Sequence, residues 1–452
     1  MKKIAFCLVL FVGVFAAVSC SKYSDNPVEQ KTDNQGSGVS EKNDTTSGAG
    51  NSDSGGNGDV VYMLPETRTI TLTDAQRKLV EKSNAFSYSL FQTTSAGENQ
   101  RGKSLVMSPL SVLYVLGMLN DGAAGATEQE IASLMGLEAG CQELVNGYCK
   151  ALMSQAPLTD PSVTLETANF MGMATDFAVS DRYQSDMQQY YMSDVASLDF
   201  RQSAALEYVN GWCSEKTHGM IPKILDEISP ATRLLLMNAV YFKATWTEKF
   251  DPDDTRDETF TMEDGQTTTM PLMHRKALAM YAPGTAYDIL CLPYGSGSKW
   301  QMMVMLPKEG QTVDDVVGSL TTVPWTTLWR QGRMRCEVDI KMPRFSTGSD
   351  VVLNGIIAQM GAPLMFTDKA DFSAITGGAE QLFVSLLKQK AAIEVSEEGT
   401  KASAVTVAAM ETTAMQPDEY KKVDFHATRP FVYLIQEISS GAVFFIGTYR
   451  GN

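Results

Sequence analysis

The stretch Arg233–Trp246 reads RLLLMNAVYFKATW and is an apolar run rich in residues that favour β-strands. It predicts a strand. Further runs of the same kind, bounded by turn residues, follow towards the end of the chain: DILCLPY (288–294), WQMMVMLP (300–307), CEVDIKMPRF (336–345), FVYLIQEI (431–438) and AVFFIGTY (442–449). The second half of the chain is therefore expected to consist mainly of strands.

Helical patterns precede these strands and return between them. LTDAQRKLVEKSNAFSYSLFQ (72–92) has helical spacing, with Thr73 and Asp74 as candidate caps. SPLSVLYVLGMLNDGA (108–123) is apolar on nearly all sides and predicts a buried helix that begins behind Ser108. Shorter helical patterns follow: ATEQEIASLMGL (126–137), LEYVNGWCSEKTHGMIPKIL (206–225) and VLNGIIAQMGAPLMF (352–366). This order predicts an α+β fold, with helices packed on large, mainly antiparallel β-sheets.

The composition describes a globular protein with an acidic surface. The chain has 452 residues, of which 44% are hydrophobic and 20% charged, so a large core can form. The formal net charge is −16 at pH 7, and the chain shows no dense cluster of Lys and Arg. This balance argues against binding to nucleic acid, anionic lipid or heparin-like polymers, which require a basic face.

The cysteines and histidines do not indicate a disulfide framework, a metal site or a catalytic centre. Beyond Cys7 and Cys20, the remaining cysteines are odd in number and show no CxxC spacing, and we expect most to be buried: Cys141, Cys149, Cys213, Cys291 and Cys336. The three histidines, His218, His274 and His426, show no HExxH or other paired spacing, so no metal or other cofactor is expected. The chain has no GxSxG elbow. We therefore expect that the protein is not an enzyme.

The N-terminus MKKIAFCLVLFVGVFAAVSC (1–20) has the pattern of an export signal. Two lysines precede an apolar stretch that is too short and wrongly flanked for a transmembrane helix. AVSC (17–20) resembles a bacterial lipobox, which implies cleavage before Cys20 and lipidation of that cysteine. The alternative is an ordinary signal peptide with an incidental cysteine.

The next segment is rich in Ser, Gly, Asn and Asp and has almost no large apolar residues, which predicts a flexible tether. Three parts follow from this: a signal peptide (1–19), a lipidated cysteine with its tether (20–59) and a folded body (60–452). We expect an exported protein that is lipid-anchored at the bacterial cell envelope. Ser21 after the lipidated cysteine favours the outer membrane or cell surface.

Several segments resemble motifs of the serpin family, in the family's own order. They are SPLSVLYVLGMLNDGAAGATEQEI (108–131), EYVNGWCSEKTHGMI (207–221), LLLMNAVYFKATWTEKFDPDDTRDETF (234–260), MFTDKADFSAI (365–375), IEVSEEGTKASAVT (393–406), TRPFVYLI (428–435) and FFIGTY (444–449). Each motif is weak alone, but the ordered set, which runs from about Thr73 to Arg450, is specific. The resemblance implies one serpin domain with an exposed reactive loop at about 397–424, and a monomeric inhibitor that uses no cofactor.

The loop sequence SEEGTKASAVTVAAMETTAMQP (396–417) is compatible with insertion into a sheet as a strand. It has no proline before Pro417, and Gly399 offers a pivot. The alternate residues that would face the core are small except for the last: Thr400, Ala402, Ala404, Thr406, Ala408 and Met410. Lys401 falls on the other face. From the residues alone an exposed helix fits as well, because Ala and Met favour helices; the resemblance favours the insertable loop.

The resemblance implies a spring-loaded trap. A target proteinase attacks the loop and forms an acyl-enzyme, and the freed loop inserts into the large sheet and holds the enzyme in a covalent complex. The hinge would comprise Glu397, Glu398, Gly399, Thr400, Lys401, Ala402, Ser403, Ala404, Val405 and Thr406. Counting along the usual loop length places the cleaved bond at Thr413–Ala414. The stretch to Pro430 is longer than in compact members, so Met410–Glu411 and Met415–Gln416 are alternatives.

Residues around that bond are small or apolar, and the next basic residue is Lys421. This favours elastase-like or subtilisin-like serine proteinases as targets, and papain-like cysteine proteinases are a further option. Alternative functions are a non-inhibitory serpin, or a surface-binding lipoprotein that uses the same tether. In each case the membrane would be contacted through the lipid anchor only.

The residues that control opening of the sheet also follow from the resemblance. Ser108, Ser111 and Asn238 match a polar cluster beneath the opening point, and Gln389 stands where the family usually has histidine. Two further residues match: Trp246, at the site where the loop first inserts, and Arg344, as a partner for Glu397. The alternative for all six is ordinary packing.

Overall fold

The structure is a computed structural model that describes residues 6–16, 66–322, 325–378, 380–400 and 420–452. The helices are α1 (Asp74–Ala96), α2 (Pro109–Gly122), α3 (Gly125–Leu134), α4 (Gln142–Gln155), η1 (Ala156–Leu158), α5 (Asp181–Tyr191), α6 (Ser203–Lys216), η2 (Pro252–Asp254), α7 (Val313–Thr322), α8 (Trp325–Gly332), α9 (Asn354–Gln359), η3 (Leu364–Phe366) and α10 (Ser373–Thr376). The strands are β1 (Phe6–Ala16), β2 (Leu105–Met107), β3 (Val163–Ala174), β4 (Ser193–Leu198), β5 (Thr232–Thr245), β6 (Arg256–Thr261), β7 (Thr267–Ala282), β8 (Tyr287–Tyr294), β9 (Trp300–Pro307), β10 (Met334–Pro343), β11 (Phe345–Val352), β12 (Leu382–Val395), β13 (Gly399–Thr400), β14 (Lys422–His426), β15 (Phe431–Glu437) and β16 (Val443–Tyr449).

The strands form two sheets. A seven-stranded sheet has the order β11-β12-β1-β5-β3-β4, with β13 also paired to β5. A nine-stranded sheet has the order β14-β10-β7-β8-β9-β15-β16-β2, with β6 paired to β7. The expected antiparallel character is right for the nine-stranded sheet, in which only β10 and β14 run parallel. The seven-stranded sheet is mixed, because β1 runs parallel to both β12 and β5, and β4 runs parallel to β3.

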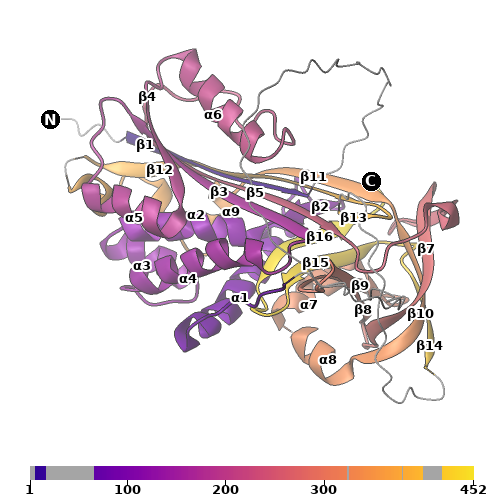
Figure 1. Ribbon diagram of the computed structural model, residues 1–452. Helices are drawn as coiled ribbons and strands as arrows, with labels where there is room; N and C mark the ends of the chain where they lie inside the picture. Colours follow the sequence, from indigo (N-terminus) through magenta and orange to yellow (C-terminus); the bar gives the residue numbers. More distant parts are fainter. Residues whose placement is uncertain (1–5, 17–65, 323–324, 379, 401–419) are drawn as a thin grey trace, which may run out of the picture. The chain divides into compact units, whose positions relative to one another are not determined.

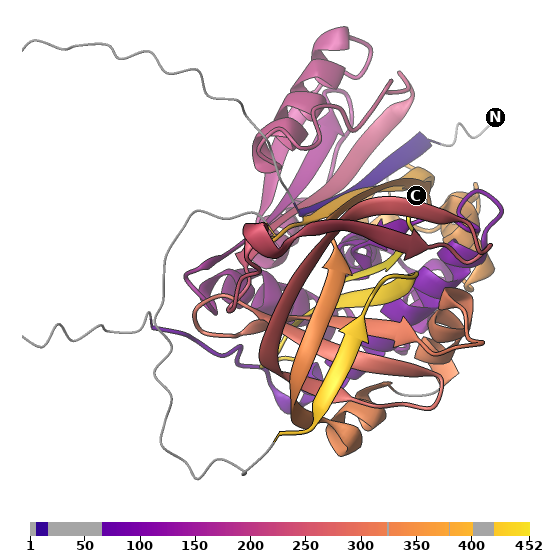
Figure 2. The same cartoon turned by 90° about the vertical axis from the view of Figure 1, so that its right-hand side faces the viewer.

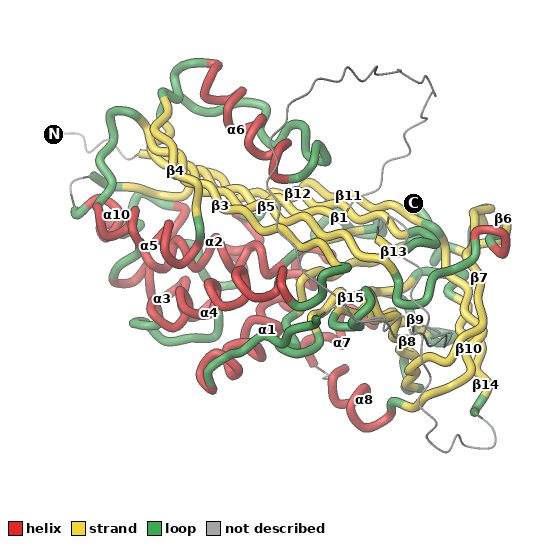
Figure 3. Tube along the Cα trace, viewed as in Figure 1, coloured by secondary structure: helices red, strands yellow, loops and turns green. Residues whose placement is uncertain are grey.

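Helices cover both faces of the seven-stranded sheet. In Figure 1 and Figure 3, α2 to α5 lie on one side of this sheet and α6 lies on the other. Every residue of α2 is buried, and the helix begins as expected, with Ser108 as its N-cap and Pro109 in the first turn. The helix α1 begins with a capping box between Thr73 and Gln76.

The predicted helix at 206–225 is too long, because α6 ends at Lys216. The side chain of Asn210 turns back to accept hydrogen bonds from the backbone N–H groups of Ile224, at 2.8 Å, and Leu225, at 2.9 Å. This amide holds the residues after α6 in a loop.

Within the described part of the chain, no helix combines the length and the apolar character needed to cross a membrane.

The five cysteines of the body are free thiols, and four of them are buried, as expected. Cys141 is half-buried. Burial raises the pKa of Cys213 to about 12 and that of Cys291 to about 12, so these thiols stay protonated at neutral pH.

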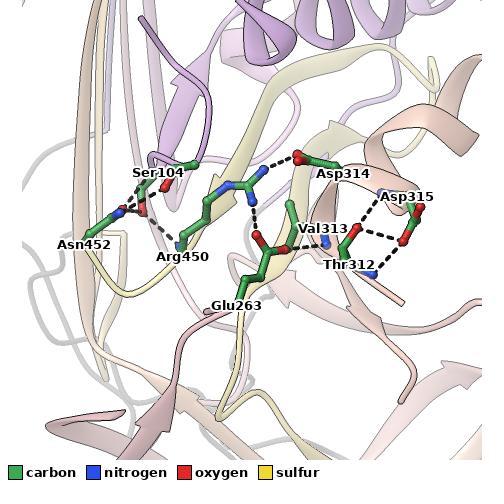
Figure 4. Close-up of polar contacts among 9 residues, drawn as sticks. Ser104, Glu263, Thr312, Val313, Asp314, Asp315, Arg450 and Asn452 are labelled. Atoms are coloured by element: carbon green, nitrogen blue, oxygen red, sulfur yellow. Dashed lines mark hydrogen bonds and ion pairs between the residues drawn. The ribbon is translucent and has the colours of Figure 1, made fainter. Parts of the chain in front are cut away.

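Arg450 and Asn452, near the C-terminus, form hydrogen bonds with Ser104, in the turn that follows α1 (Figure 4). Arg450 is buried and pairs with Glu263 and Asp314, and its backbone N–H donates to the Ser104 hydroxyl at 2.9 Å.

Ser104 ends the segment GENQRGKS (97–104), whose letters fit the phosphate-loop pattern GxxxxGK[ST]. The segment follows a helix and precedes the strand β2, which is the reverse of the strand–loop–helix context that a phosphate loop requires. We therefore assign Ser104 to the hydrogen bond with Arg450 and not to phosphate binding.

Candidate functional site

β12 ends in a tight turn that reverses the chain at one end of the seven-stranded sheet. Ser396 and Gly399 exchange both backbone hydrogen bonds, at 3.0 and 3.1 Å. Gly399 has a φ of 120°, and a Cβ at this position would lie 2.5 Å from the carbonyl oxygen of Ala244 and 2.5 Å from the nitrogen of Trp246. The turn therefore requires glycine. The indole N–H of Trp246 donates to the carbonyl oxygen of Ser396 at 2.9 Å, so the expected pivot is held in place by this tryptophan.

Thr400 is the first residue after the pivot that faces the core. It pairs with Ala244 of β5 in antiparallel register and is fully buried. Its hydroxyl lies 3.1 Å from the hydroxyl of Tyr294, which stacks on Trp246 with ring centroids 4.3 Å apart. Burial raises the pKa of Tyr294 well above its ordinary value, so this hydroxyl stays protonated. Thr400, the first of the alternate residues predicted to face the core, is therefore on the core side.

Glu397 is buried and is held by side chains from two neighbouring segments. Arg344 Nε lies 3.2 and 3.1 Å from its two carboxylate oxygens, Arg344 Nη2 lies 2.5 Å from Oε1, and the Thr255 hydroxyl donates to Oε1 at 2.7 Å. Burial acts to raise the pKa of Glu397, but the hydrogen bonds from Arg344 and Thr255 outweigh it and hold this pKa below its ordinary value. The structure therefore brings together the two residues that were expected to pair.

We expect the Glu397→Gln variant to be less stable than the parent protein at pH 7 by roughly 1–3 kcal/mol, the usual contribution of hydrogen bonds to a charged group. The folded-state pKa of Glu397 is depressed, so the stabilisation is complete above the ordinary value of 4.5 and is lost as the pH falls through the folded-state pKa. The stability difference should therefore shrink in acid. Denaturant unfolding of both proteins at pH 7 and pH 3 measures it.

Glu398→Gln is the matched control for this prediction. Glu398 pairs with Lys249 at 2.5 Å, but the Glu398 side chain is 46% exposed, so we expect a change below about 1 kcal/mol. A stability loss in Glu397→Gln that is equal at both pH values would contradict the assigned role of the carboxylate.

A second cluster lies beneath the middle of the seven-stranded sheet. Ser108, Ser111 and Gln389 are buried there, and Gln389 Nε2 donates to the carbonyl oxygen of Ser108 at 2.8 Å. The hydroxyls of Ser108 and Ser111 lie 3.2 Å apart. Asn238 does not join them, because its Nδ2 donates to Asn169 Oδ1 on β3 at 2.8 Å. Three of the four expected members are therefore in contact, and the fourth is bonded elsewhere.

The strand β1 separates Asn238 from Gln389. Val12 of β1 pairs with Asn238 on one side and with Gln389 on the other. β5 and β12 are thus two strand spacings apart at this level, or about 9.6 Å. This explains why the polar cluster is divided.

β1 and β13 occupy the same column between β5 and β12. Ala16, the last residue of β1, pairs with Phe242, and Thr400 pairs with Ala244 only two residues further along β5. The two strands meet end to end and run in opposite directions. A longer strand continuing from β13 would therefore require the positions that β1 holds.

Other predicted site residues lie outside the described part of the chain, and their roles stay predictions. They are Cys20, the hinge residues Lys401, Ala402, Ser403, Ala404, Val405 and Thr406, and the candidate cleavage residues Met410, Glu411, Thr413, Ala414, Met415 and Gln416.

Sequence reasoning missed three residues that support the site: Thr255, Tyr294 and Asn169. Tyr294 ends the strand run DILCLPY, but its contact with Thr400 spans 106 positions of the sequence. The contact between Thr255 and Glu397 spans 142 positions. No local pattern reports such contacts.

The structure thus combines a mixed sheet covered by helices with a glycine turn at Ser396–Gly399, after which Thr400 pairs with β5. The family model described as "Serpin (serine protease inhibitor)" matches residues 81–451. The chain belongs to the serpin family, whose members are mostly protease inhibitors and not enzymes.

Relatives of known name agree with this assignment. A serpin-like protein of Thermococcus kodakarensis is 30% identical over 393 residues, which cover 86% of this chain and 89% of that protein. The leukocyte elastase inhibitor of Bos taurus is 29% identical over 385 residues, which cover 82% of this chain and 98% of that protein. The solved structure of the native thermophilic serpin tengpin aligns with a TM-score of 0.73 at 25% identity, covering 85% of this chain and 96% of that one.

Proposed function

We propose that the protein is a single-use inhibitor of serine proteinases, which it traps as covalent acyl-enzymes by inserting its reactive loop into the seven-stranded sheet. The observation that carries this proposal is the position of Gly399 and Thr400, which already form an antiparallel pair with β5. They lie at the head of a column between two strands that run parallel to each other. This pairing supports the proposal, because insertion would continue the same antiparallel register along β5.

The register of β13 supports continued insertion. Gly399 pairs with Thr245 and Thr400 with Ala244, so each step along the loop moves one residue back along β5. Twelve further steps, from 400 to 412 and from 244 to 232, bring Thr412 opposite Thr232, where β5 begins. A cut at Thr413–Ala414 would therefore release a strand that spans the whole of β5. A cut at Met410–Glu411 would release a strand three residues shorter than this one, and a cut at Met415–Gln416 a strand two residues longer.

The side chains of β5 fit this register. The residues opposite the inward loop positions, of which all but Met410 are small, are buried: Phe242, Val240, Asn238, Leu236 and Leu234. Small loop side chains can lie over them without overpacking the core. Lys401 would lie directly opposite Lys243, which is half-buried, so this pair of like charges opposes insertion at that one position.

The covalent step needs only the proteinase and the loop. The hydroxyl oxygen of the enzyme's serine attacks the carbonyl carbon of Thr413, and the peptide bond to Ala414 breaks. The new amino terminus of Ala414 takes the proton, and the ester to Thr413 remains. Insertion carries that ester away with the enzyme, and the distorted enzyme fails to hydrolyse it.

Elastase-like or subtilisin-like proteinases are the proposed target class, and papain-like cysteine proteinases are a further option. The small and apolar residues around Thr413 suit shallow, uncharged specificity pockets. The name of the bovine relative, leukocyte elastase inhibitor, is in line with this class.

We expect a purified sample to form a covalent complex with such an enzyme. Mixing the chain after removal of residues 1–19 with an elastase-like and a subtilisin-like proteinase, followed by a denaturing gel, should give a band at the summed mass. Trypsin is the matched comparison and should give little of it, because the proposed bond is not flanked by Lys or Arg. Cleavage of the loop without any higher band would identify a substrate, and so contradict the inhibitor.

Export and anchoring form part of the proposal. The segment 1–19 would be removed, Cys20 lipidated, and the body held by its tether at the outer membrane or cell surface as a monomer. Removal of 1–19 would also take β1 out of the sheet and vacate the column that the loop needs.

This gives a prediction about the leader. A Cys20→Ser variant that retains residues 1–19 should form less complex than the chain without them, by more than about tenfold, because β1 and the loop need the same strand edges. It should also melt at a higher temperature, because β1 pairs with both neighbours. Gel densitometry and thermal melting of the two proteins measure this. Equal trapping by both would show that the leader does not hold the column.

A further inference from the structure

Four side chains that commonly bind metals lie together on one face of the nine-stranded sheet. They are His274 on β7, Asp339 on β10, and Asp424 and His426 on β14. These three strands are neighbours in the sheet, and Figure 2 shows β10 and β14 side by side at the front. The register places Asp339 opposite Asp424.

The register also places both histidines beside one residue. Lys341 of β10 pairs with His274 on one side and with His426 on the other. Both imidazoles point to Asp339, whose Oδ1 lies 2.8 Å from His274 Nε2 and 3.2 Å from His426 Nε2. Ligand atoms of Asp339, Asp424 and His426 lie within 4.8 Å of one another.

We propose that His274, Asp339, His426 and Asp424 form a binding site for a divalent transition-metal ion such as Zn²⁺. Two imidazoles and two carboxylates suit zinc, which takes four ligands at about 2.0–2.2 Å in tetrahedral geometry. Those bond lengths place the ligand atoms about 3.3 Å apart. Asp339 Oδ1 is close to this separation from both imidazoles, at 2.8 and 3.2 Å, and the other ligand atoms would have to move closer together by side-chain rotation. The side chains of His274, Asp339 and His426 are 31%, 22% and 38% exposed, so an ion can enter from solvent.

Two lysines lie on the same face as the proposed ligands, and only one of them pairs with a ligand carboxylate. Lys341 is engaged elsewhere, because its ammonium lies 2.7 Å from both carboxylate oxygens of Glu258. Lys276 lies 3.2 Å from Asp339 Oδ2, and its side chain is 64% exposed. A divalent ion would displace this ammonium into solvent. Lys276 is therefore a competitor of the metal.

The site would fasten the strand that follows the reactive loop. β14 begins three residues after the segment 401–419 and is an edge strand, paired with β10 alone among the described strands. Because β14 follows this segment so closely, entry of the uncleaved segment into the seven-stranded sheet would pull β14 away from β10. A metal ion bound across β7, β10 and β14 opposes that departure. This consequence rests on the proposed inhibitory function, whereas metal binding does not.

Calorimetric titration of the purified protein with zinc chloride at neutral pH tests the site. One ion should bind per chain, and His274→Ala and His426→Ala should each weaken the affinity by more than about tenfold. His218→Ala is the matched control, because this third histidine pairs with Glu166 on β3 and should leave zinc binding unchanged. Lys276→Gln should strengthen binding. No zinc uptake, or equal uptake by all the histidine variants, would overturn the proposal.

Two further measurements separate the site from general stability. His426→Gln keeps the size of the side chain, and its melting in metal-free buffer shows whether the fold is intact. Cobalt(II) bound at the site should give the visible absorption of tetrahedral coordination, and both histidine variants should lose it. If zinc also slows the spontaneous loss of inhibitory activity in the parent but not in His426→Gln, the fastening role is supported. If zinc binds but that rate is unchanged, the site stands and only its link to the loop is refuted.

Discussion

The Thr400→Arg variant should be cleaved by target proteinases but should fail to trap them. Thr400 is fully buried on the core side of β13, against Tyr294. A guanidinium would there meet the neutral hydroxyl of Tyr294, and burying an unpaired charge costs several kcal/mol. Insertion would then be slower than hydrolysis of the acyl-enzyme, and each 1.4 kcal/mol changes their ratio tenfold. We expect the number of inhibitor molecules consumed per enzyme inactivated to rise by more than about tenfold.

Two controls make this result specific. Lys401→Arg carries the same side chain one position later, on the face assigned to solvent, and should trap as the parent does. Thr400→Val keeps the shape of the residue and loses only its contact with Tyr294, so most trapping should remain. Active-site titration of the enzyme and gel densitometry provide the counts. Unchanged trapping by Thr400→Arg would refute the assignment of loop faces.

Cleavage of the loop should make the body much harder to melt. The register from Thr400 to Thr412 adds about twelve residues to the seven-stranded sheet, and net contributions of about 1 kcal/mol per hydrogen bond sum to roughly 10 kcal/mol. For a chain of this size we expect the melting temperature to rise by more than about 10 °C. Calorimetric scans of intact and nicked protein, both without residues 1–19, give the comparison.

The nicked Thr400→Arg protein is the matched control for this second prediction. It carries the same cut but should gain far less, because its first inward residue resists burial. Equal melting of intact and nicked parent protein would mean that no stored energy exists, and the trapping mechanism would fall with it.

Much of the fold follows from local patterns in the sequence. The cap at Ser108, the buried helix behind it and the long strand ending at Thr245 are visible as periodicity and capping residues. The pairing of Arg344 with Glu397 came from the resemblance and not from a pattern, since 53 positions separate the two residues. Family motifs thus supplied the long-range contacts that periodicity does not report.

Two features could not be predicted, for different physical reasons. The run FCLVLFVGVFA (6–16) reads equally as an export signal and as a strand buried on both faces, because continuous apolar character specifies neither. The second feature is the contact of His274 and His426 with Asp339, which are 65 and 87 positions away. It depends on the register of three strands, and a shift of one residue would turn those side chains to the opposite face. The spacing of the histidines in the sequence therefore gave no indication that His274 and His426 lie beside Asp339 in the fold.

The position of β1 bears on the proposed removal of residues 1–19. That removal would leave β5 and β12 with unpaired backbone groups facing each other across a space one strand wide. The two strands point the same way, so they can join directly if one half of the sheet slides towards the other by about 4.8 Å. Such a movement would bring Asn238 next to Gln389 and reunite the divided polar cluster. Removal of residues 1–19 would then allow the seven-stranded sheet to close, and cleavage of the loop by a proteinase would reopen it.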